Sequence, residues 1–234
     1  MGDIAPKKKT NDQTSMLLRE TAKGLVEGLF GLAASDRKDL ILSLGYLFQR
    51  ARSGTFLNAL AQEWDRLREK GRVKADYVSS EQHQECLQEM LDFLDRDSPD
   101  DLRFRMLKAI FLGAATETQS DRDSVLPQQY MSICRTISSG EALVLQATFA
   151  VAERGDATPS TSARDWLQTI GKESGLVSHE LVNIHEQKLI TKNLLIRRVN
   201  TDGSGVALGN HYRLTSLGMA ICRFIKAYEE QNAV

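Results

Sequence analysis

The hydrophobic period changes twice between residues 166 and 225, and this constrains the fold more than any other feature of the chain. Residues 176–190 carry apolar side chains at helical spacing behind a cap at Ser174 or Ser178. Asn193 follows, and asparagine is the residue other than glycine that most readily adopts the left-handed conformation that ends a helix. We therefore expect a helix that stops there. Its apolar face would consist of Val177, Leu181, Ile184 and Leu189.

Beyond Asn193 the pattern becomes typical of β-structure. Residues 194–199 resemble a strand, residues 202–205 (Asp-Gly-Ser-Gly) tolerate positive φ, and residues 206–214 offer a return strand. Thr215 is suited to cap a final helix, in which apolar residues recur at intervals of three and four. With residues 163–170 as the first helix of a helix-turn-helix pair, the pattern predicts a winged helix with one β-hairpin.

Two short segments of this region resemble a known family. Residues 212–218, Tyr-Arg-Leu-Thr-Ser-Leu-Gly, resemble the Tyr-x-Leu-Thr-x-x-Gly signature that closes the wing of PadR-type and MarR-type winged helices. Residues 189–198 are similar to the Leu-x-x-x-Gly-Leu-Ile-x-Arg segment of those proteins, with Asn193 in the glycine position. The resemblance covers about the last third of the chain. It implies a fold rather than an activity, because winged helices serve both nucleic-acid and protein recognition.

The rest of the chain is predicted to be mainly α. Residues 1–14 are polar and include three lysines, so we expect a flexible tail. Residues 15–138 repeat apolar side chains at helical spacing and are expected to form a helical bundle domain. Residues 139–234 would then form the winged-helix domain. Two modest domains suit a chain of 234 residues.

Local signals within the bundle predict where its helices begin and end. Gly54 is expected to break one helix, and Ser79 with Gln82 fits a capping box at the start of another. Residues 98–101 (Ser-Pro-Asp-Asp) form the clearest helix start, and that helix should run to about residue 117. In the helix between these signals, Cys86 is expected in the core and His83 at the surface.

The segment from Ser15 to Ala34 reads as an amphipathic helix. Charged residues interrupt its apolar run, so we expect contact with protein, either a partner or a second copy, rather than with a membrane. The expected partner or oligomer face consists of Leu18, Leu25, Leu29 and Phe30.

Composition and motifs limit the chemistry that the chain offers. Three cysteines lie far apart without a Cys-x-x-Cys pair, which argues against a disulfide framework and a zinc site and favours a reducing cytoplasm. His83 and Cys86 share a helical face, but two further metal ligands are missing. No nucleophile elbow, phosphate-binding loop or dinucleotide fingerprint is recognisable. We therefore expect no metal, no cofactor and no enzymatic activity.

The charge balance of the chain gives no general attraction to DNA. The formal net charge is -1, and from Ser139 onward ten Lys and Arg face ten Asp and Glu. DNA affinity depends on neutralising several phosphates, so a local basic patch would be required. The candidate contacts implied by the resemblance are Ser178, His179, Asn183 and Gln187 for base edges, and Lys188, Lys192, Arg197, Arg198 and Arg213 for phosphates.

Two functions remain open at this point. The first is a non-enzymatic cytoplasmic interaction protein, whose winged helix docks onto a protein or nucleoprotein partner. The alternative is a DNA-binding transcriptional regulator. The order of bundle and winged helix, with residues 126–130 leading through residues 137–141 into the terminal module, also resembles bacterial abortive-infection alpha-type proteins, which implies an association with phage defence.

Overall fold

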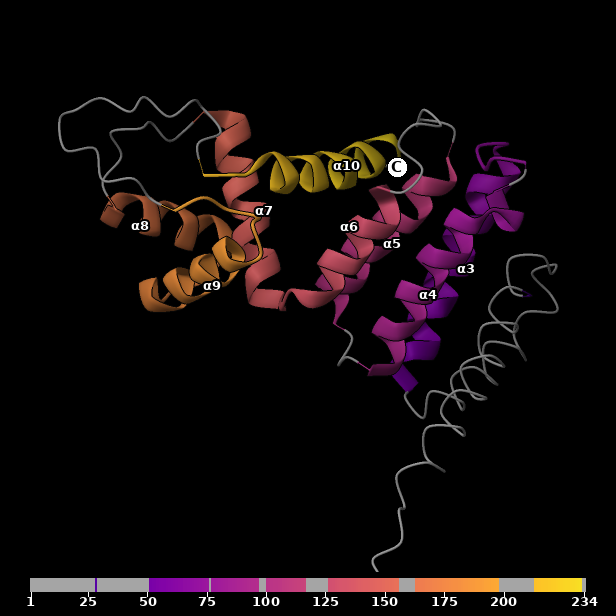
Figure 1. The fold of residues 1–234 in the computed structure, drawn as a ribbon, viewed down its shortest axis with the longest axis horizontal. Helices are drawn as coiled ribbons and strands as arrows, with labels where there is room; N and C mark the ends of the chain where they lie inside the picture. The colour runs from indigo at the N-terminus through magenta and orange to yellow at the C-terminus, as the bar shows by residue number, and fades with distance from the viewer. Residues whose placement is uncertain are drawn as a thin grey trace, which may run out of the picture. The chain divides into compact units, whose positions relative to one another are not determined.

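The computed structural model describes residue 28 and residues 51–75, 77–96, 100–116, 126–155, 163–197 and 213–232. Across these residues the protein is mainly α-helical, as predicted, and β-pairing is confined to two isolated antiparallel bridges (Figure 1). Most of the predicted wing hairpin, residues 198–212, lies outside the described residues. None of the described helices is long and apolar enough to cross a membrane.

The chain divides into two compact units. Unit 1 contains Met1–Pro99 and Phe111–Ser132, and unit 2 contains Asp100–Ile110 and Ile133–Val234. The division passes through two helices, so each of them contributes to both units. The predicted domain limits at residues 14 and 138 stay predictions.

Helix α3, Ala51–Glu69, is the first helix of unit 1 whose bounds the structure describes. Apolar side chains at intervals of three and four bury one stripe of this helix, including Leu57, Leu60 and Trp64. The prediction that Gly54 breaks the helix is wrong, because Gly54 lies inside α3. A single helical glycine costs only about 1 kcal/mol. Burial of the stripe outweighs that cost.

A short 3-10 helix, η1 (Tyr77–Ser79), leads into α4 (Glu81–Arg96). The hydroxyl of Ser80 accepts a hydrogen bond from the backbone N–H of His83 at 3.1 Å and donates to the carbonyl of Tyr77 at 2.6 Å. Ser80 therefore caps α4, and the prediction that Ser79 does so is wrong by one residue. The reason is that residue 79 is still part of the preceding 3-10 turn.

Helices α5 (Asp101–Ala115) and α6 (Leu126–Thr136) contribute to both units. The carboxylate of Asp100 accepts the backbone N–H of Arg103 at 3.0 Å and so caps α5. The predicted cap at Ser98 is therefore two residues too early, and the helix ends at Ala115, close to the predicted end near residue 117. Pro127 occupies the first turn of α6, where a backbone N–H has no helical partner to lose.

The core of unit 1 is centred on a histidine. His83 is fully buried, and its ring centroid lies 6.0 Å from that of Trp64, 5.1 Å from that of Tyr77 and 5.5 Å from that of Phe111. Cys86 is buried as predicted, whereas the prediction of a surface His83 is wrong. The two residues are three apart and share one face of α4, so burial of one carries the other inward. Burial lowers the pKa of His83 to about 4.

In the described part of the chain, unit 2 contains four whole helices besides its shares of α5 and α6: α7 (Ser139–Arg154), α8 (Ala163–Ser174), α9 (His179–Thr191) and α10 (Ser216–Asn232). α7 packs against each of the other three, and α8 and α9 lie side by side (Figure 1). Ser138 and Glu141 form a capping box at the start of α7, and Gly155 ends the helix at φ 70°.

The burial of His83 predicts a loss of stability in acid. The pKa of its imidazole is about 6.5 in the unfolded chain and about 4 in the folded chain. Between these two pH values the imidazole is protonated in the unfolded chain and neutral in the folded chain. The contribution of neutral His83 is therefore fully present above pH 6.5 and is lost as the pH falls towards 4. Between pH 7 and pH 5 this group should remove about 2 kcal/mol from the free energy of unfolding.

The measurement is urea unfolding at both pH values, for the wild type and for His83→Leu. The leucine variant lacks the titrating group. Its free energy of unfolding should therefore decrease by about 2 kcal/mol less than that of the wild type when the pH is lowered from 7 to 5. Equal pH dependence of the two proteins would contradict the prediction.

Candidate interaction surface

Helix α9 is held at both ends by backbone features that the sequence predicts. The hydroxyl of Ser178 accepts the N–H of Leu181 at 3.3 Å, which confirms Ser178 rather than Ser174 as the cap. The turn before it contains Gly175 at φ 73°. After the last helical residue, Asn193 adopts φ 57°, as expected for the residue that ends this helix.

The start of α10 is fastened to the end of α9 by Thr215. Its hydroxyl accepts the N–H of Gly218 at 2.9 Å, which confirms the predicted cap, and donates to the carbonyl of Asn193 at 2.7 Å. A Cβ atom at Gly218 would lie 2.3 Å from the carbonyl oxygen of Leu194. The Thr-x-x-Gly motif is thereby explained locally, because the hydroxyl caps the helix and the glycine permits close backbone approach.

A buried polar cluster fixes which side of α9 faces the interior of unit 2. Glu186 is fully buried on α9. Its carboxylate oxygen Oε1 accepts the indole N–H of Trp166 from α8 at 2.5 Å and lies 2.9 Å from Nη2 of Arg213. The guanidinium also donates to the carbonyl of Ile196 at 2.8 Å and lies 5.3 Å from the centre of the Trp166 ring. Burial of a carboxylate requires such compensation.

A second ion pair occupies Lys192, the residue that follows α9. Nζ of Lys192 donates to Glu141 of α7 at 2.5 Å, and the Glu141 side chain is only 3% exposed. Burial raises the pKa of Glu141, but hydrogen bonds from Lys192 and Ser138 outweigh that effect, so this pKa lies below its ordinary value. Lys192 is therefore occupied by the capping box of α7.

The opposite face of α9 is exposed and partly aliphatic. Leu181 and Ile184 are each 47% exposed, and Val177, just before the helix, is 97% exposed. The prediction that these three residues form the inward face is wrong. Burial of the Glu186 cluster, together with Val182 and Leu189, turns them outward. The sequence signal that was missed is Trp166, because a buried indole N–H requires an acceptor on a neighbouring helix.

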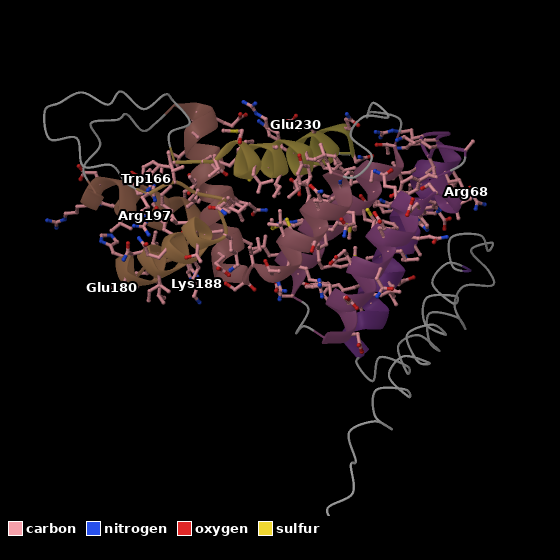
Figure 2. The ribbon with its side chains drawn as sticks, in the orientation of Figure 1. Arg68, Trp166, Glu180, Lys188, Arg197 and Glu230 are labelled. Atoms are coloured by element: carbon pink, nitrogen blue, oxygen red, sulfur yellow. The ribbon has the colours of Figure 1, made fainter. Side chains whose placement is uncertain are left out.

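The outward face also carries polar and charged side chains. Glu180, Asn183, Gln187 and Lys188 are all exposed. Figure 2 shows Glu180 and Lys188 along the outer edge of α9, below the helix in this view. Beside the start of α9 lies an open hollow of about 360 Å³, lined by Gln168, Gly171, Lys172, Gly175, Leu176, Val177 and His179.

The nine candidate DNA contacts therefore have different surroundings. Asn183, Gln187, Lys188 and Arg197 are exposed, and Ser178 and His179 are half-buried at the start of α9. Lys192 is bound to Glu141, and Arg213 is 3% exposed beside Glu186. Arg198 lies outside the described residues, as does the whole predicted partner face of Leu18, Leu25, Leu29 and Phe30.

Comparison of the chain with models of known families, with curated proteins and with solved structures gave no match. The resemblances to winged helices and to abortive-infection proteins stay predictions that rest on the residues quoted for them.

The buried cluster predicts a large and specific loss of stability on substitution. Arg213→Met leaves the Glu186 carboxylate buried without its cation, which should lower the free energy of unfolding by about 3 to 5 kcal/mol. Adding Glu186→Gln to this variant should recover part of the loss, because the amide oxygen still accepts the Trp166 indole N–H. Urea unfolding followed by circular dichroism measures both effects.

The matched control is Arg197→Met, which changes an exposed arginine and should alter stability by no more than about 0.5 kcal/mol. If Arg213→Met were as mild as this control, the cluster would not hold α9 in place.

Proposed function

We propose that the chain is a non-enzymatic interaction protein, and that unit 2 is a winged helix that docks onto a protein partner through the outward face of α9. The observation that carries this proposal is the exposure of Val177, Leu181 and Ile184 on one side of the expected recognition helix. Aliphatic side chains gain free energy when a protein surface covers them, at about 25 cal/mol per Å² of apolar area. Phosphates offer them no comparable gain.

The winged-helix assignment draws support from the order of local features. α8 and α9 are joined by a short turn, which is the arrangement of a helix-turn-helix pair. Leu195 and Leu214 then form an isolated antiparallel bridge, at the place where the two strands of a wing would meet. Thr215 begins the last helix immediately after it.

The distribution of charge favours a protein partner over DNA. Glu141 holds Lys192, and Glu186 holds Arg213, so two of the five expected phosphate contacts are occupied by carboxylates. On the exposed face of α9, Lys188 is accompanied by Glu180. A surface without net positive charge lacks the counterion release that supplies much of DNA affinity.

The DNA-binding alternative can be tested directly, because three of its candidate contacts are exposed: Asn183, Gln187 and Arg197. We expect weak duplex binding in low salt and none in moderate salt, measured by fluorescence anisotropy with labelled duplexes. The combined variant Arg197→Ala and Arg198→Ala should lower this low-salt affinity only slightly and equally for every duplex sequence, because it removes two charges from a nonspecific electrostatic contact. A clear loss of affinity in this variant would overturn the protein-docking proposal in favour of a regulator.

Docking through α9 also predicts position-specific cross-linking. A photoreactive amino acid at residue 184 of the full chain should give a protein adduct in cells that express the chain natively, because this position lies in the middle of the exposed face. The matched control is residue 227, an exposed position on α10. Equal adducts at the two positions, or adducts of residue 184 with nucleic acid alone, would contradict the proposal.

A further inference from the structure

We infer that the occupant of the α9 face is α9 of a second copy of this chain, paired antiparallel about a two-fold axis at Ile184. The inference rests on the proposed function, since it names the partner of the same surface. It is carried by the order of charged and aliphatic side chains along the exposed side of the helix.

The charges on this face are self-complementary. Glu180 lies four residues before Ile184 and Lys188 lies four residues after it, and all three side chains are exposed. A two-fold axis at Ile184 reverses the direction of the second helix. Glu180 of each copy is then brought to the level of Lys188 of the other copy, so that the same contact forms twice.

The same two-fold rotation places the aliphatic residues of the two copies against each other. Ile184 meets its own counterpart on the axis, and Val177 of one copy reaches the level of Thr191 of the other. Leu181, which is 47% exposed, lies within the covered length. The pairing therefore removes the exposed aliphatic side chains from water while each charge approaches an opposite charge.

Glu180 and Lys188 do not pair with each other within one chain. Glu180 and Lys188 are eight residues apart, which is about 12 Å along a helix and too far for an intramolecular ion pair. The remaining acid of α9, Glu186, is buried against Arg213. The Ser178 hydroxyl donates to Glu180 at 2.7 Å, and this hydrogen bond lowers the pKa of the Glu180 carboxylate.

The dimer should be weak. A helix of 13 residues offers less contact area than the standard interface of about 800 Å² per partner. We therefore expect the chain to associate reversibly in the micromolar range, with a sedimentation coefficient that rises with concentration.

Charge reversal gives a direct test by analytical ultracentrifugation of the full chain. Glu180→Lys places lysine opposite Lys188, and Lys188→Glu places glutamate opposite Glu180, each of them twice per dimer. Each single variant should weaken self-association by roughly tenfold or more. A mixture of the two variants should associate again as a heterodimer, because every contact across the axis then joins opposite charges. The double variant should also recover self-association.

The matched control is Glu229→Lys, which makes the same charge change at an exposed position on α10 and should leave association unchanged. Circular dichroism verifies that each variant is folded. A wild-type chain that stays monomeric at high micromolar concentration would overturn the inference. Association that is insensitive to both reversals, or that fails to return in the mixture, would overturn it as well.

The two proposals fail in different ways. If residue 184 cross-links to a different protein while the purified chain stays monomeric, the dimer is excluded and protein docking through α9 stands. If duplex affinity depends on Arg197 and Arg198, protein docking itself is excluded.

Discussion

The contact of Glu186 with Trp166 and Arg213 governs the geometry of unit 2. A carboxylate buried without compensation would cost several kcal/mol, so the three side chains have to meet. They come from α8, from α9 and from the residue before Leu214, which are separate parts of the chain. One polar cluster therefore fixes the rotation of α9 about its own axis and the return of the chain towards α10.

The rotation of α9 decides the character of the exposed surface. Apolar residues occur on two sides of this helix, so either side would give a plausible core. Once Glu186 is directed inward, Val182 and Leu189 pack beside it, and Leu181 and Ile184 face outward. An aliphatic exposed face is thus the consequence of an internal ion pair.

The same principle applies to two basic residues near α9. Lys192 and Arg213 each contact a carboxylate from within unit 2, at 2.5 Å and 2.9 Å. Their charges stabilise the packing of α7, α8 and α9 and are already balanced. In unit 1, a neutral His83 similarly packs among aromatic rings instead of carrying charge at the surface.

Sequence alone determined the features that depend on a few neighbouring residues: the mainly helical class, the end of α9 at Asn193 and the cap at Thr215. It narrowed the cap of α9 to Ser174 or Ser178, and the structure shows Ser178. These follow from backbone conformational preference and from hydrogen bonds between residues close in the chain. Only the tertiary structure decided which face of α9 is buried. That choice depends on Trp166, Glu186 and Arg213, which are distant in sequence. Helical spacing shows the period of the apolar residues but does not show which residues of other elements pack against them.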